Sequence, residues 1–217
     1  MADYKSVLFD LDGTLVDTSP DLGFALNTLL QEEGLTALPH ELIRPVASNG
    51  SAGLLGLGFG LTADDPDFKP LQQRFIRLYQ DNIVRGSVLF PGMPEILNFL
   101  EKSGITWGIV TNKPAFLTDP LVQLLHLTER AACVVSGDTT SHAKPHPAPM
   151  LHACKLISVA PEDCLYIGDA ARDIEAGKNV NMPTIAARYG YIAVNDDPDA
   201  WQADGYIDHP RELLKWF

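Results

Sequence analysis

Long apolar stretches are absent from this 217-residue sequence, and basic residues and cysteines are scarce. No apolar run approaches the ~20 residues that a helix needs to cross a bilayer, so we expect no membrane span. Lysine and arginine together number 16 against 28 acidic residues, which gives a formal net charge of -12. That balance argues against a nucleic-acid partner, because nucleic-acid phosphates need a basic track. A small anionic substrate is still compatible, since a bound metal can make a site locally positive.

The three cysteines, Cys133, Cys154 and Cys164, are odd in number and lack the spacing of a metal site. Their neighbours are apolar, so we expect reduced core residues in a cytoplasmic protein. The N-terminal segment MADYKSVLFD lacks the basic start and the long apolar stretch of a signal peptide, which agrees with that location. Internal repeats and low-complexity tracts are also absent, and nothing in the sequence predicts the oligomeric state.

After residue 90, short apolar runs alternate with helix-like segments. The runs are GITWGIVT, ACVVS, CLYIG and PTIAA. Near-continuous apolar runs are typical of parallel strands that are buried on both faces. Helices are expected between them, at residues 94–103, 114–125, 147–157 and 173–180. With SVLF near the N-terminus as one more strand, the pattern predicts an α/β fold with a doubly wound, Rossmann-like parallel sheet.

Residues 19–85 show a different pattern. The segments PDLGFALNTLLQEEGL and DFKPLQQRFIRLYQDNIV both carry apolar residues at helical spacing. We identify no strand signal between them. The sequence therefore predicts an α/β core made of residues 1–18 and 86–217, and a helical cap domain of residues 19–85 inserted after the first strand.

Acidic residues cluster where the first predicted strand ends, in SVLFDLDGTLVDT. Ligands of open α/β sheets bind at the carboxyl ends of the strands, so Asp10 and Asp12 can face one crevice. Uncompensated anions this close together are costly, so we expect a bound cation. Hard oxygen ligands favour Mg²⁺. Asp17 is expected at the junction with the cap.

Three later strand ends carry matching chemistry. GIVTNK contains Thr111 and Asn112 ahead of a helix start, where a hydroxyl group and free helix N–H groups could hold a phosphate oxygen. SHAKPHPAP holds Lys144 in a proline-rich loop. YIGDAARD contains Asp169 directly after a strand and Asp173 four residues later. Both of these carboxylates could complete a metal shell.

In order and in residue type, these segments resemble the motifs of the haloacid dehalogenase superfamily: DLDGT, VTN, the lysine of SHAKP, and GDAARD. The resemblance spans nearly the whole chain, including the inserted cap. Within the superfamily, LFPGMPE, WGIVTNKP, YIGDAARDIEAG and ARYGYI resemble bacterial phosphoglycolate phosphatases. They are especially similar to a subgroup that acts on N-acetylmuramic acid 6-phosphate in cell-wall recycling.

The resemblance implies a Mg²⁺-dependent phosphatase of the phosphoglycolate phosphatase type, acting on a small phosphorylated metabolite. An N-acetylmuramic acid 6-phosphate phosphatase and a phosphomutase of the same superfamily stay open as alternatives. By the resemblance, Asp10 is the nucleophile and Asp12 the general acid and base. Thr111 and Lys144 hold the transferring phosphoryl group. The implied metal ligands are Asp10, the main-chain carbonyl of Asp12, Asp169 and, in support, Asp173.

The resemblance also implies that specificity residues lie in the cap. The stretch ASNGSAG, residues 47–53, is predicted to be a polar loop, and we expect Ser48, Asn49, Gly50 and Ser51 to contact substrate together with Asn112 of the core. Arg44 is expected to be a surface charge on a helix rather than a substrate ligand. The stretch GLLGLGFG is expected to pack the cap against the core rather than to touch a membrane.

Other classes of protein fit less well. A signalling receiver domain also combines acids, threonine and lysine around Mg²⁺, but it is about half this length and needs no inserted cap. A phosphonatase needs a cap lysine, and Lys69, the only lysine within residues 19–85, lies in a predicted helix away from the polar stretch. His142, His146 and His152 are spaced by four and six residues across prolines, which fits no common zinc site.

Overall fold

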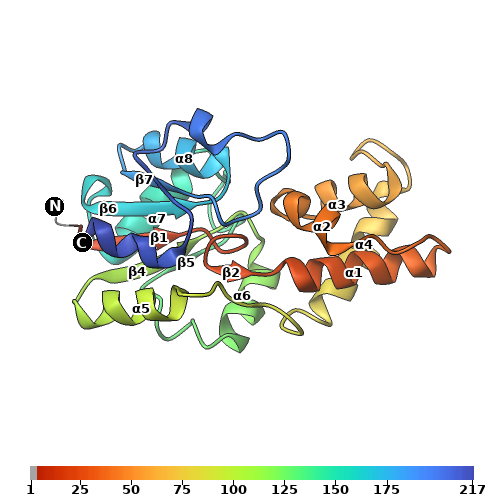
Figure 1. Cartoon of the computed structure of the whole chain (residues 1–217), viewed down its shortest axis with the longest axis horizontal. Helices are drawn as coiled ribbons and strands as arrows, with labels where there is room; N and C mark the ends of the chain where they lie inside the picture. The colour runs from red at the N-terminus through yellow and green to blue at the C-terminus, as the bar shows by residue number, and fades with distance from the viewer. Residues whose placement is uncertain (1–3) are drawn as a thin grey trace.

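The sheet predicted from the apolar runs is present in the computed structural model, which describes residues 4–217. Residues 1–3 of the predicted core lie outside this range. Six parallel strands pair in the order β5-β4-β1-β6-β7-β8 (Figure 1). They are β1 (Ser6–Phe9), β4 (Thr106–Val110), β5 (Val134–Val135), β6 (Cys164–Gly168), β7 (Thr184–Ala187) and β8 (Gly205–Ile207).

The central strand β1 pairs with β4 on one side and β6 on the other. Phe9 stands opposite Ile109 in the first ladder and Ile167 in the second. The three strands therefore end at nearly the same level. The residues that follow them meet at one edge of the sheet, where ligands bind in this class of fold.

Two pairs of helices cover the two faces of the sheet. They are α5 (Met93–Lys102), α6 (Ala115–Leu124), α7 (Ala148–Ile157) and α8 (Ala171–Lys178). Val7 and Phe9 belong to the apolar cluster that contains α5 and α6, whereas Leu8 belongs to the cluster that contains α7 and α8. This alternation is what a strand with two buried faces requires. Three short 3₁₀ segments complete the core: η2 (Pro161–Asp163), η3 (Pro198–Trp201) and η4 (Pro210–Trp216).

The three cysteines are buried free thiols in the second of these clusters, as expected of core residues. The Sγ atoms of Cys154 and Cys164 lie 4.0 Å apart. Within residues 4–217, no helix is both long and apolar enough to span a membrane.

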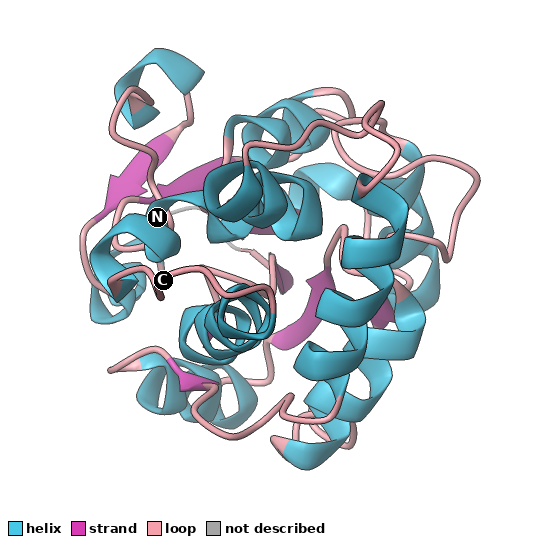
Figure 2. Cartoon of the chain, turned by 90° about the vertical axis from the view of Figure 1, so that its right-hand side faces the viewer, coloured by secondary structure: helices cyan, strands magenta, loops and turns pink. Residues whose placement is uncertain are grey.

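Between β1 and α5 the chain leaves the sheet and forms a helical lobe, seen at the right of Figure 1. In Figure 2, viewed from the side of this lobe, helices surround the strands. The lobe contains α1 (Ser19–Glu32), α2 (His40–Ile43), η1 (Arg44–Asn49), α3 (Gly50–Phe59) and α4 (Phe68–Gln80). We call this lobe the cap. Its exact limits stay a prediction.

A two-stranded ribbon joins the cap to the core. It consists of β2 (Val16–Asp17) and β3 (Val88–Leu89), which pair antiparallel with Val16 opposite Leu89. The sequence did not predict this ribbon, because strands of two residues carry no periodic signal. The chain therefore enters and leaves the cap side by side.

The stretch 47–53, predicted to be a polar loop, is helical. Its first part belongs to η1, and α3 begins at Gly50. The helix forms despite its glycines because Leu54 and Leu55 are fully buried. Gly58 also permits close approach to α1, since a Cβ atom there would lie 2.9 Å from Cδ1 of Leu26. The GLLGLGFG stretch thus packs within the cap, against α1, rather than against the core as expected.

Candidate active site

A cavity lies between the carboxyl edge of the sheet and the cap. Its volume is about 540 Å³, and residues of both parts line it. Asp10 follows β1 and Thr111 follows β4, and both of these side chains are almost completely buried. The strand register therefore gathers the predicted polar groups at one end of this cavity.

Three carboxylates form the acidic cluster of this site. One oxygen from each of Asp10, Asp169 and Asp173 lies within 4.8 Å of the others, and no other such group occurs among residues 4–217. Burial, reinforced by the charge of Asp173, raises the pKa of Asp10 to about 6. Burial and the charges of Asp10 and Asp173 raise the pKa of Asp169 to about 7. A set of three buried carboxylates that offers only oxygen ligands fits a hard divalent cation.

Asp169 is held by donors from three segments of the chain. Thr14 Oγ1 and Ser48 Oγ each donate to its carboxylate at 3.1 Å, and the Tyr191 N–H donates at 2.8 Å. Gly13 allows the turn after β1 to pass close to this group, since a Cβ there would lie 2.1 Å from Asp169 Oδ2. Ser48 belongs to the cap, so the cap reaches the acidic cluster itself.

Lys144 supplies the buried cation of the site, and its side chain has no exposed area. Its Nζ lies 3.0 Å from Asp10 Oδ1 and 2.7 Å from Asp173 Oδ1. It also donates to the Val110 carbonyl at 2.8 Å and to the Tyr166 hydroxyl at 2.7 Å. Burial lowers the pKa of Lys144, but the two carboxylates outweigh that effect and raise it overall. The group therefore stays an ammonium ion.

Asn112 holds the loop that carries Lys144. Its Nδ2 donates to the Lys144 carbonyl and its Oδ1 accepts from the Lys144 N–H, both at 2.9 Å. Asn112 also lines the cavity. Because both ends of its amide are engaged, the geometry supports a positioning role, and the predicted contact with substrate stays a prediction.

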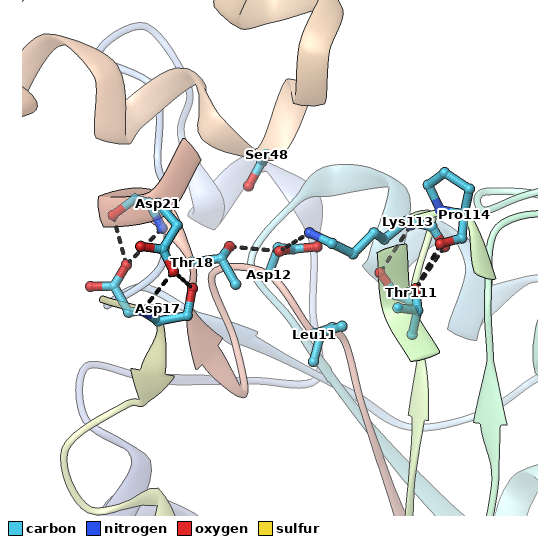
Figure 3. Close-up of polar contacts among 12 residues, drawn as sticks. Leu11, Asp12, Asp17, Thr18, Asp21, Ser48, Thr111, Lys113 and Pro114 are labelled. Carbon is cyan, nitrogen blue, oxygen red and sulfur yellow. Dashed lines mark hydrogen bonds and ion pairs between the residues drawn. The ribbon is translucent and has the colours of Figure 1, made fainter. Parts of the chain in front are cut away.

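Asp12 lies apart from the acidic cluster and faces the cavity (Figure 3). Its Oδ1 accepts hydrogen bonds from Thr18 Oγ1 at 2.6 Å and from Lys113 Nζ at 2.8 Å. Thr111 lies next to this pair, and its Oγ1 accepts from the Lys113 N–H at 3.1 Å. Lys113 was not among the predicted site residues, although it stands directly after the Thr–Asn pair of GIVTNK.

The predicted cap residues all reach the cavity. Ser48, Asn49, Gly50 and Ser51 line it, with Gln72 donating to Ser51 Oγ at 2.8 Å.

Arg172, which the sequence did not predict as a site residue, also lines the cavity, and it donates to the Ser48 carbonyl at 2.8 Å. Nothing in GDAARD distinguishes this arginine from an ordinary helix charge. Tyr166 was missed for a similar reason, since it occupies a strand position in the apolar run CLYIG.

Arg44 is not the surface charge that we expected, because its side chain is half-buried and paired. It does not line the cavity, which agrees with the expectation that it is not a substrate ligand. Its guanidinium donates to the carbonyls of Gly190 and Tyr189 at 2.8 and 2.9 Å. It also lies 5.1 Å from the centre of the Tyr191 ring. Arg44 thus joins the cap to the loop that follows β7.

Two further acids stabilise the junction between core and cap (Figure 3). Asp17, expected at this junction, accepts hydrogen bonds from the Ser19 hydroxyl and from the Tyr191 hydroxyl. Asp21 accepts hydrogen bonds from the backbone N–H groups of Gly86 and Ser87. The acids of SVLFDLDGTLVDT therefore divide between the cavity and the junction.

Comparisons with known proteins agree with this arrangement. Residues 7–187 match the model of a family described as haloacid dehalogenase-like hydrolase. An N-acetylmuramic acid 6-phosphate phosphatase from Pseudomonas aeruginosa is 41% identical over 97% of this chain and 93% of its own length. A phosphoglycolate phosphatase from Xanthomonas campestris is 40% identical over 96% of this chain and 94% of its own length. The crystal structure of a predicted phosphoglycolate phosphatase from Haemophilus somnus superposes with a TM-score of 0.87 at 27% identity, covering 100% of this chain and 99% of that one.

Proposed function

Because the chain belongs to the haloacid dehalogenase-like hydrolase family, we propose that it is a Mg²⁺-dependent phosphomonoesterase that works through an aspartyl-phosphate. The observation that carries this proposal is the cluster of Asp10, Asp169 and Asp173 beside the buried Lys144, at the end of the cavity between core and cap. The oxygen cluster fits Mg²⁺, which would offset the charge of the phosphoryl group when bound.

In the proposed first step, the Asp10 carboxylate attacks phosphorus and the ester P–O bond breaks. Asp12, which faces the cavity, gives its proton to the departing alkoxide. In the second step a water molecule attacks the phosphorus of the aspartyl-phosphate, the bond between phosphorus and the Asp10 oxygen breaks, and Asp12 accepts the proton of that water. Inorganic phosphate leaves and both carboxylates return to their starting states.

The remaining core residues would stabilise the transferring group. The ammonium group of Lys144 lies next to Asp10, where the phosphoryl oxygens gather negative charge during transfer. Thr111 lies between the end of β4 and the N-terminus of α6. Its hydroxyl and the backbone N–H groups at that helix start can donate hydrogen bonds to the same phosphoryl oxygens. Asp173 and Asn112 would position Lys144, since both bind it directly.

The cavity bears on the choice between phosphoglycolate and a sugar phosphate as substrate. Pockets for small molecules span roughly 300–1,000 Å³, and this cavity, at about 540 Å³, has room for a sugar-sized leaving group. Polar cap residues line one part of it, and apolar side chains such as Phe75 and Phe116 line another. A pyranose ring presents both kinds of surface. We therefore keep phosphoglycolate as the general type and N-acetylmuramic acid 6-phosphate as a second candidate that the cavity favours.

A phosphate-release assay over a panel of phosphorylated metabolites tests the proposal. The panel includes phosphoglycolate, N-acetylmuramic acid 6-phosphate and simple sugar phosphates, each with Mg²⁺ and with EDTA. We expect release of inorganic phosphate that requires Mg²⁺. Release that persists in EDTA would overturn the metal requirement. Transfer of phosphate between sugar positions without net release would favour the phosphomutase alternative. The cytoplasmic location stays a prediction.

A further inference from the structure

Lys113 places a positive charge on the cavity wall at a distance from the phosphoryl-binding lysine. Its side chain is only 7% exposed, and its Nζ lies 2.8 Å from Asp12 Oδ1. Among the described residues that line the cavity, Lys113 and Arg172 are the cationic ones. An ammonium group has three N–H donors, and one of them serves Asp12. Lys113 therefore keeps donor capacity for a bound molecule.

Tyr79 of α4 lies against this ammonium group. Lys113 Nζ is 4.6 Å from the centre of the Tyr79 ring, and Tyr79 also lines the cavity. The Tyr79 hydroxyl is the one buried side-chain polar atom without a hydrogen-bond partner among residues 4–217. Burial raises the pKa of Tyr79 to about 12, so the hydroxyl remains a donor at neutral pH. Buried polar groups are nearly always paired, so this hydroxyl can donate to an acceptor that binds next to Lys113.

Lys113 and Tyr79 are placed to contact the leaving group of the substrate rather than its phosphoryl group. Asp12, which would protonate the departing oxygen, is the direct neighbour of Lys113, whereas Lys144 lies beside Asp10 and Asp173. The two lysines thus serve different ends of the cavity. Apart from Asp10 and Asp12, no carboxylate of the described residues lines the cavity. Among the described residues, Asp12 is thus the one acid at the leaving-group end, and in the proposed first step it carries a proton and does not repel a second anion.

We propose that Lys113 and Tyr79 form a binding site for a carboxylate of the leaving group, so that the substrate is a phosphate ester of a hydroxy acid. The inference rests on the phosphatase function proposed above and narrows it to one substrate class. Phosphoglycolate and N-acetylmuramic acid 6-phosphate both belong to this class, and they differ in the distance between the acid and the phosphate. Arg44 is the cation nearest in sequence to the polar stretch 47–53, but its guanidinium group donates to backbone carbonyls instead.

Matched pairs of substrates test the site. 2-Phosphoglycolate is compared with 2-hydroxyethyl phosphate, and N-acetylmuramic acid 6-phosphate with N-acetylglucosamine 6-phosphate, because the members of each pair differ in the acid-bearing group. We expect wild-type kcat/KM to favour the acid by ~10-fold or more in at least one pair. Lys113→Met should reduce that preference to about threefold or less, and Lys113→Arg should restore much of it. Tyr79→Phe should lower the preference several-fold.

Two control variants show whether the preference depends on this site or on positive charge elsewhere in the protein. Lys155→Met, at an exposed position of α7, should leave the preference unchanged. The assignment is overturned if Arg172→Met, rather than Lys113→Met, removes the preference. It is also overturned if Lys113→Met and Tyr79→Phe lower both members of a pair equally. Equal wild-type turnover of acid and neutral esters overturns the carboxylate site and leaves the phosphatase function intact. A failure to hydrolyse any ester of the panel overturns both.

Discussion

Asp10 is the residue on which the proposed chemistry depends most directly. Its Oδ1 accepts hydrogen bonds from the Leu11 N–H and from the Lys144 ammonium group. Asp10→Asn keeps the size of the side chain and removes the nucleophile, so we expect turnover to fall by about 10³-fold or more. Phosphate release at saturating Mg²⁺ measures the effect, and circular dichroism checks the fold. A variant that keeps more than about a tenth of wild-type turnover would contradict the aspartyl-phosphate mechanism.

Burial of Asp169 places a carboxylate where a metal ion can bind, and it also makes the ionised form of this group costly for the stability of the fold. Its pKa rises from the ordinary value of 3.8 to about 7, chiefly because the group is buried. The folded protein thus binds this proton more tightly than the unfolded chain does. Ionisation of Asp169 therefore costs stability progressively as the pH rises from about 4 through about 7, and the whole cost is present above that range.

We accordingly expect Asp169→Asn to raise the Tm of the metal-free protein by about 2–4 °C near pH 8. The gain should shrink as the pH falls toward about 5, because the wild-type carboxyl group is then protonated in the folded state. Thermal melts in EDTA at both pH values measure this difference. With Mg²⁺ added, only the wild type should gain stability. A variant that melts below the wild type at both pH values would show that the hydrogen bonds of Asp169 outweigh its charge.

Among the helical elements, η1 contacts the core through Arg44. Two charge-assisted hydrogen bonds join it to carbonyls of the loop after β7. We expect Arg44→Met to weaken the contact between cap and core by about 1–2 kcal/mol. The KM for the specific substrate should then rise roughly tenfold, whereas kcat/KM for a small aryl phosphate should change less than about threefold.

Steady-state kinetics on both substrates checks this expectation for Arg44. Arg77→Met, at an exposed position of α4, provides a matched cap control. Amide hydrogen exchange of η1 should accelerate in Arg44→Met and not in the control. Equal losses on both substrates would mean that Arg44 supports the core rather than the closed cap.

The elements that sequence predicted well are those with long apolar patterns. The four core helices lie within about two residues of their predicted ranges, because each has several buried positions at helical spacing. Strands β1, β4 and β6 follow from near-continuous apolar runs. By contrast β2, β3 and β8 have two or three residues each, too few to show a period.

Glycine misled the prediction at α3, where low helix propensity suggested a loop. Burial of Leu54 and Leu55 and close packing on α1 outweigh that propensity, and neither is visible in the local sequence. The residues of the candidate site likewise fall into those that local sequence predicts and those that depend on tertiary packing. Asp10 and Asp169 could be predicted because they stand at strand ends. Arg172 and Tyr79 could not, because their position on the cavity wall depends on how cap and core pack.

Over the whole molecule, cap and core share one apolar cluster. Leu26 and Phe75 of the cap belong to the same cluster as Phe9 and Ile109 of the sheet. We therefore expect a single cooperative unfolding transition in urea. Fluorescence of the buried Trp107 reports mainly on the core, and far-ultraviolet circular dichroism includes the cap helices. The two midpoints should coincide within about 0.2 M. An earlier transition in the circular dichroism signal would show that the cap unfolds independently.

The ribbon of β2 and β3 has a mechanical consequence. Two strands that run side by side form a strap, which bends across its width far more easily than it stretches or shears. The ribbon therefore acts as a hinge, and rotation of the cap about one axis should meet the least resistance. In such a lever, displacement grows with distance from the axis. A small rotation at Val16 and Leu89 would therefore move the end of the cap that is remote from the ribbon more than the residues that adjoin the ribbon. The cavity, which lies between the cap and the edge of the sheet, should thus widen as the cap turns about the ribbon.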